Sequence, residues 1–174
     1  MLNKFTHNST KESTLYNNIL LLSRNKLFYT KFNLCDTFQN RIHLIFLHIS
    51  FLFIKVKQRD NSNSYYKFYQ GMFDYIFRKI EIDMREIGYS DTTVNKNMKF
   101  LVKIFYNILL NCEDYEKKTF DKKSLFLFKY LDINKAYKHN KSINIIDYFD
   151  QYHSFCLDLS TNNVLKGDLN FSYK

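Results

Sequence analysis

The chain has 174 residues, 45% of them hydrophobic, which suits one domain with one hydrophobic core and excludes disorder throughout. It has no Pro and only three Gly, whereas a β-sheet protein of this size needs more of both in its tight turns, so helices are favoured. The net charge of +9 allows a nucleic acid or an anionic membrane as partner, but an A/T-rich genome also explains the many Lys, Asn, Ile, Phe and Tyr residues.

The N-terminal part predicts a polar leader followed by the domain. We expect residues 1–12 to be flexible and residues 13–171 to form the single domain. The leader shows neither the hydrophobic core of a signal peptide nor an Arg-rich amphipathic presequence. The segment 13–29 predicts a first helix. Its aliphatic face consists of Leu15, Ile19 and Leu22.

A second helix is expected from Asp36 to about Lys57. Asp36 is a suitable N-cap, and Gln39 stands where it can complete a capping box. Residues 42–54 are the longest apolar run of the chain, but about 13 residues are too few to span a bilayer. The run therefore predicts a buried helix.

Three polar residues recur every seven positions in this helix. Arg41, His48 and Lys55 form one narrow stripe, with Ile45 and Leu52 between them. Such a stripe is either the water-facing edge of a helical bundle or a surface that recognises a partner. The sequence leaves both interpretations open.

Apolar residues at spacings of three and four predict a third helix over 65–87 and a fourth over 94–109. Gly88 stands where a left-handed residue ends a helix, and Ser90 or Asp91 can cap the next one. The chain should therefore turn sharply between these two helices.

Four charged residues flank this predicted corner. Arg85 and Glu86 either hold the corner through an ion pair or contact a partner. Lys96 and Lys99 follow at the start of the next helix. A helix–turn–helix that reads DNA needs more side chains for base edges than this segment offers, so we predict no DNA binding.

The C-terminal third predicts two further helices. A charged link over 113–124 leads to a shorter helix at 125–138, and a last helix covers 143–159 before a loose end at 165–171. No strand alternation persists along the chain. The predicted fold is all-α, a compact single-domain bundle of about six helices.

Signatures of enzymatic chemistry were not found, and we predict no catalytic residue, no metal and no cofactor. Asp150 and His153 have the spacing of a carboxylate–histidine metal site, but no set of facing carboxylates completes it. His43 and His48 lie about 140° apart around a helix and cannot bind one ion together. Three cysteines without a CxxC pair predict neither a disulfide framework nor a zinc site, and favour a reducing compartment.

Several motifs, taken in order, resemble one family. The segment LYNNILLLSRNKLFY (15–29) is similar to the family's opening helix, and Asp36, Arg41 and His48 fit its signature of Asp-Thr/Ser, Arg and His. The segment LKGDLNF (165–171) is similar to its closing motif. The central block matches at Arg85, Glu86, Gly88, Asp91, Val94, Lys96, Met98, Lys99, Phe105 and Tyr106. The chain thus resembles the ubiquinol–cytochrome c chaperones, assembly factors of respiratory complex III, although Asn107 replaces a usual Gly and Lys79 a frequent acidic residue.

The resemblance implies a non-enzymatic assembly chaperone that binds newly made cytochrome b during its maturation. Further implied partners are the ribosome, a small partner subunit and, peripherally, the inner membrane. The expected location is the bacterial cytoplasm at the inner membrane, or alternatively the matrix side of the mitochondrial inner membrane. The candidate partner-binding residues are Arg41, His48, Lys55, Arg85, Glu86, Lys96 and Lys99.

The alternative interpretation is a basic module that binds RNA or the ribosome. The net charge supports it, and 14 Tyr and 18 Phe residues offer rings on which bases can stack. Most of these rings, however, stand at helical core spacing, which predicts packing in the interior.

Overall fold

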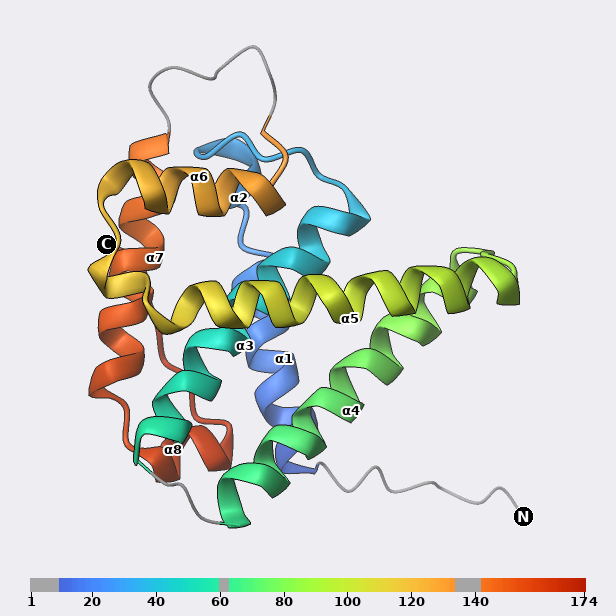
Figure 1. The fold of residues 1–174 in the computed structure, drawn as a ribbon, viewed down its shortest axis with the longest axis horizontal. Helices are drawn as coiled ribbons and strands as arrows, with labels where there is room; N and C mark the ends of the chain where they lie inside the picture. Colours follow the sequence, from blue (N-terminus) through green and yellow to red (C-terminus); the bar gives the residue numbers. More distant parts are fainter. Residues whose placement is uncertain (1–9, 60–62, 134–141) are drawn as a thin grey trace.

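The computed structural model describes residues 10–59, 63–133 and 142–174, which are helical with short connections. No strand occurs in these ranges, and Leu34 and Ile133 form an isolated antiparallel bridge. The elements are α1 (Lys11–Ser23), α2 (Leu27–Thr30), α3 (Phe38–Arg59), α4 (Asn63–Glu86), α5 (Asp91–Glu113), the 3-10 turn η1 (Tyr115–Lys117), α6 (Phe120–Tyr130), α7 (Ser142–Asp158) and α8 (Thr161–Lys166) (Figure 1). The prediction of an all-α bundle is confirmed: α1, α3, α4, α5, α6 and α7 are the longer helices, and α2 and α8 are short additions.

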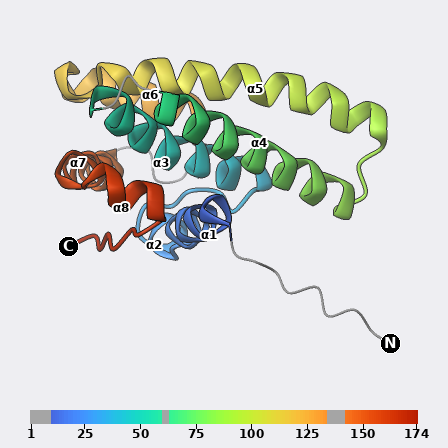
Figure 2. The same ribbon diagram turned by 90° about the horizontal axis from the view of Figure 1, so that it is seen from below.

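Helix α3 lies at the centre of the bundle. Every residue from Ile42 to Val56 is buried, and the helix contacts α1, α4, α5, α7 and α8. A helix that is apolar on all sides needs neighbours on all sides. Accordingly, α5 and α6 cover one side of α3, and α1, α2, α7 and α8 cover the other (Figure 2). Among the described helices, none combines the length and the hydropathy that a membrane span requires.

Helices α4 and α5 form a hairpin whose outer end projects from the bundle (Figures 1 and 2). We call residues 81–100 the arm. The predicted corner at its tip is confirmed: Gly88 has a φ of +98°, and its N–H donates to the Arg85 carbonyl at 3.0 Å. Ser90, one of the two predicted caps, accepts a hydrogen bond from the Thr93 N–H.

The first predicted helix is divided in two. Helix α1 ends at Ser23, and α2 begins at Leu27. The Leu27 N–H donates to the side-chain oxygen of Asn25 at 3.0 Å. Asn is favoured in such turns because its side chain competes with the helical hydrogen bonds. Helix α1 begins at Lys11, inside the predicted leader, while residues 1–9 lie outside the described part.

Other element boundaries also shift. Thr37, rather than Asp36, caps α3, because its hydroxyl accepts from the Asn40 N–H at 3.1 Å. Helix α6 begins within the predicted charged link, and the predicted helical end at 134–138 lies outside the described residues. The last predicted helix is confirmed as α7, but α8 replaces part of the loose end and stops at Gly167, where φ is +81°.

Candidate functional site

Arg41 lies at the surface, at the start of α3. Its Nε and Nη2 donate to the two carboxylate oxygens of Asp36 at 2.8 and 2.9 Å. These hydrogen bonds hold the pKa of Asp36 below its ordinary value. Because both side chains are about half exposed, the pair contributes little to stability. Arg41 fastens the loop before α3 to the helix and remains accessible to a partner.

His48 lies in the interior and is fully buried. Its Nδ1 donates to the Leu44 carbonyl at 2.6 Å, so Nε2 accepts from the Tyr148 hydroxyl at 2.8 Å. The rings of Phe28, Tyr148, Phe149 and Tyr152 surround it. Burial lowers the pKa of His48 to about 4, so the ring is neutral at pH 7.

Lys55 is also buried, with 3% of its surface exposed. Its ammonium group donates to the carbonyl of Leu157 in the last turn of α7. A cation is favourable there because the helix dipole places negative partial charge at that end. Lys55 and His48 therefore both tie α3 to α7.

The predicted stripe is thus wrong as an exposed surface. Only Arg41 of its three residues is at the surface, whereas α7 covers His48 and Lys55. The two buried residues cannot touch a partner in this structure, and their contacts specify how α3 packs. Whether Arg41 contacts a partner stays a prediction.

Arg85 locks the tip of the arm. Its Nη2 donates to Glu81 Oε1 at 2.9 Å, and its Nη1 donates to Asp91 Oδ1 across the corner. One guanidinium thus joins the end of α4 to the start of α5, which is one of the two roles predicted for it. With the left-handed Gly88, these bonds give the tip a defined shape.

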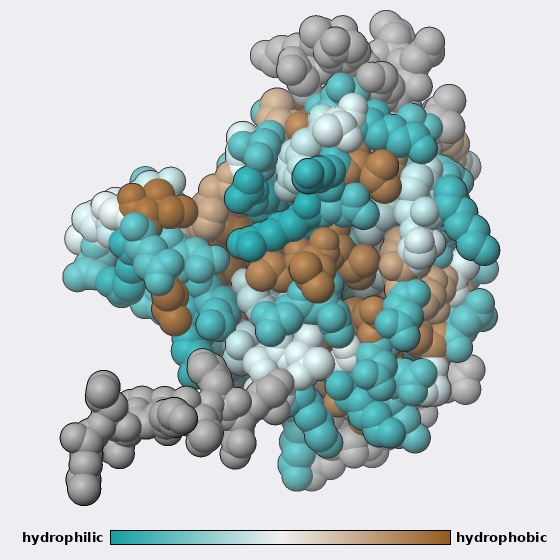
Figure 3. Space-filling model, turned by 180° about the vertical axis from the view of Figure 1, so that it is seen from behind, coloured by the Kyte–Doolittle hydropathy of each residue, from teal (hydrophilic) through white to brown (hydrophobic). Residues whose placement is uncertain are grey.

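The arm presents apolar and charged side chains together. Ile87 and Tyr89 are 57% and 42% exposed at the tip. Glu86, Lys96 and Lys99 are exposed as well, and in the described part of the chain none of the three forms an ion pair. Seen from behind, the outer end of the arm stands apart from the bundle and carries hydrophobic among hydrophilic residues (Figure 3). Exposed apolar groups on a rigid projection are typical of binding surfaces.

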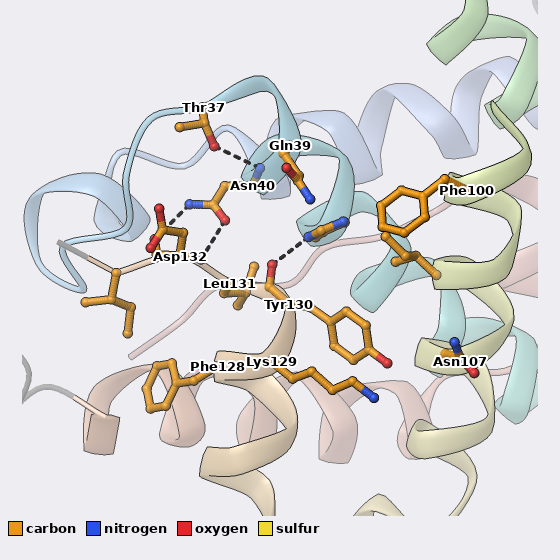
Figure 4. Close-up of a pocket in the computed structure, with 13 residues that line it drawn as sticks. Thr37, Gln39, Asn40, Phe100, Asn107, Phe128, Lys129, Tyr130, Leu131 and Asp132 are labelled. Atoms are coloured by element: carbon orange, nitrogen blue, oxygen red, sulfur yellow. Dashed lines mark hydrogen bonds between the residues drawn. The ribbon is translucent and has the colours of Figure 1, made fainter. Parts of the chain in front are cut away.

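Two cavities adjoin the arm at the N-terminal turn of α3. The arm cavity, about 390 Å³, lies between α3 and the arm, and the α5–α6 cavity, about 710 Å³, lies between α3, α5 and the end of α6. Thr37, Gln39 and Phe100 line both of them, so the two hollows are neighbours. Phe100 is 56% exposed and extends from α5 toward Gln39 (Figure 4).

Asn40 organises the floor of the α5–α6 cavity. Its amide nitrogen donates to the carbonyls of Cys35 and Asp132 at 2.7 and 2.8 Å, and its oxygen accepts from the Asp132 N–H at 2.9 Å (Figure 4). These bonds join the loop before α3 to the chain that follows α6. Asn40 is not among the residues predicted from the sequence, although a polar side chain in the first turn of a buried helix usually has a specific hydrogen-bond partner.

The residues considered for metal binding have other contacts. Asp150 accepts a hydrogen bond from Lys123 Nζ at 2.7 Å, and His153 packs against the rings of Phe51 and Tyr115. No group of three or more potential metal ligands is found within the described ranges.

Comparisons with known proteins found one family model and a solved structure that match this chain. The family model described as ubiquinol–cytochrome C chaperone matches residues 30–125, which contain α3, α4, α5 and the start of α6. A solved structure, the crystal structure of the Cbp3 homolog from Brucella abortus, is similar with a TM-score of 0.77 and 21% identity, over 94% of this chain and 89% of that one. No curated protein sequence matches the chain.

Proposed function

Because the chain belongs to the ubiquinol–cytochrome c chaperone family, we propose that it is a non-enzymatic assembly factor of respiratory complex III that holds newly made cytochrome b. The family match over residues 30–125 carries the proposal. The similar fold of the Cbp3 homolog from Brucella abortus supports it.

The arm is our candidate for the client-binding surface. A client made of membrane helices exposes apolar side chains until it is assembled, and a chaperone must cover them reversibly. Ile87, Tyr89 and Phe100 offer exposed apolar area on a tip that the Arg85 hydrogen bonds keep in shape. Because the tip is ordered before binding, little conformational entropy is lost when a client docks.

The proposed setting is the face of the inner membrane where cytochrome b is made. In a bacterium this is the cytoplasmic face, and in a mitochondrion the matrix face. The ribosome and a small partner subunit are further proposed partners. Arg41, Glu86, Lys96 and Lys99 remain candidate contacts because all four are exposed.

A basic RNA- or ribosome-binding module is the second candidate function. Helix α5 has no acidic residue from Thr92 to Cys112, and Lys96, Lys99 and Lys103 are exposed along it. An uncompensated row of lysines attracts phosphate, and such binding weakens steeply as the salt concentration rises.

Crosslinking and affinity capture of the tagged chain from growing cells distinguish these functions. We expect cytochrome b to be enriched over other membrane proteins, and the double variant Ile87→Ser, Tyr89→Ser to lose it. Leu21→Ser is the matched control, because Leu21 is 71% exposed on α1, on the side of the bundle away from α5. Capture of ribosomal RNA without cytochrome b, abolished by moderate salt and by Lys96→Gln with Lys99→Gln, would support the second function instead.

A further inference from the structure

His43 and Tyr130 line the α5–α6 cavity, and each has a buried polar atom without a hydrogen-bond partner in the described part of the chain. His43 and Tyr130 are 2% and 8% exposed. The Nδ1 atom of His43 lies 2.5 Å from the Tyr130 carbonyl, which can only accept, so Nδ1 carries the proton. Within the described part of the chain, neither Nε2 of His43 nor the hydroxyl of Tyr130 has a hydrogen-bond partner.

The unpaired Nε2 atom is an acceptor that needs a donor. Burial lowers the pKa of His43, so its ring is neutral and Nε2 keeps its lone pair. Native proteins rarely leave a buried acceptor unpaired, because its lost hydration is not replaced. A ligand that donates to Nε2 would restore this interaction at no further desolvation cost to the protein.

The cavity walls restrict which donor fits. Phe100, Ile104, Phe128 and Leu131 contribute apolar surface, and a volume of about 710 Å³ is typical of ligand pockets. Lys129 also lines the cavity, which disfavours a cationic donor such as another Lys or an Arg. Ser, Thr, Asn and Gln also carry neutral donors, but these side chains have no ring and would leave the apolar walls of the cavity uncovered. Figure 4 shows the Tyr130 side chain directed toward α5 on the side of Asn107.

We propose that this cavity receives a tryptophan side chain of a bound polypeptide, whose indole N–H donates to Nε2 of His43. Indole combines a large apolar ring with a group that is a donor only, which matches an atom that is an acceptor only. This chain contains no Trp, so neither its own termini nor a second copy can supply the ring. Nε2 is closed to solvent in this structure, so a neighbouring side chain must move before the indole reaches it, and the half-exposed Phe100 ring of the cavity wall is our candidate.

The inference rests on the proposed function, since it assumes that the chain binds a polypeptide. Binding of N-acetyl-tryptophanamide tests it directly, with the analogue methylated at the indole nitrogen as the matched control. The full chain labelled with ¹⁵N reports the Nε2 shift of His43. Nε2 of His48 is the internal reference, because it already accepts a hydrogen bond from Tyr148.

We expect N-acetyl-tryptophanamide to move the His43 Nε2 resonance, to leave that of His48 unchanged, and to bind at least about fivefold more tightly than the methylated analogue. His43→Phe should remove this difference between the two probes. If that variant does not fold, the probe pair on the unaltered chain still decides.

Three results would overturn the inference: no binding of either probe, equal binding of both, or an Nε2 shift that already shows a hydrogen bond, from water, in the free protein. The proposed function is tested separately by the capture of cytochrome b. Capture without probe binding refutes the tryptophan site alone, whereas probe binding without capture refutes the proposed client.

Discussion

Acid should destabilise the fold through His48. Its pKa is about 4 in the folded chain and 6.5 for an ordinary histidine, so between these values the unfolded chain binds a proton that the folded chain does not. The contribution of His48 is therefore complete above pH 6.5 and is lost as the pH falls toward 4. At 1.36 kcal/mol per pH unit, the total loss is about 3 kcal/mol.

Urea unfolding at pH 7 and pH 5, followed by circular dichroism, measures this effect. The proton linkage of His48 should remove about 2 kcal/mol between these two pH values. In His48→Gln the pH-dependent loss should be smaller than in the parent by that amount, although the variant is less stable at both pH values. His153→Gln is the comparison variant, because burial lowers the pKa of His153 as well, although this side chain is only partly buried. An unchanged pH dependence in His48→Gln would refute the buried, neutral ring.

Four further substitutions test stability, each measured as the free energy of unfolding in urea. Asn40→Ala should cost on the order of 3 kcal/mol, because the three hydrogen bonds of its side chain to Cys35 and Asp132 are lost; a loss below 1 kcal/mol would contradict this role. Gly167→Ala should cost about 2–3 kcal/mol, because its φ is +81° and a Cβ would lie 2.9 Å from the Leu15 nitrogen. Gly88→Ala should cost only about 1 kcal/mol, since its φ of +98° is strained for Ala but no atom lies within 4 Å of the Cβ; equal costs at the two glycines would refute the packing argument. Tyr130→Phe should raise stability by about 1 kcal/mol, because it removes a buried hydroxyl without a partner; a clear loss would show that the hydroxyl is bonded.

Local signals in the sequence were sufficient to predict the corner between α4 and α5, but not that this end of the hairpin projects from the bundle. The corner depends on a left-handed residue, a cap and two periodic helices, all within a few turns of one another. Gly88, Ser90 and most of the apolar face of α4 therefore appear in the structure as predicted, but Ile87, the last residue of the predicted face, lies beyond the helix and is exposed. The error at the start of α3, where Thr37 rather than Asp36 is the cap, arose because both residues are good caps and Asp36 pairs with Arg41 instead.

Contacts between distant segments could not be predicted in the same way. A polar residue every seven positions looks like an exposed stripe unless it is known that α7 packs over it, as it does over His48 and Lys55. The α5–α6 cavity likewise depends on contacts of His43 and Asn40 with residues 87 and 92 positions away. No periodicity in a single sequence reports such pairs.

Site-specific photocrosslinking to newly made cytochrome b shows whether the arm binds this client. A benzoylphenylalanine at Ile87, on the tip of the arm, is compared with one at the exposed Leu21 of α1, a helix on the side of the bundle away from α5, during synthesis of cytochrome b. We expect a crosslink to full-length or nascent cytochrome b from Ile87 and none from Leu21. Crosslinks from Ile87 to ribosomal RNA alone, or equal labelling of cytochrome b from both positions, would contradict it.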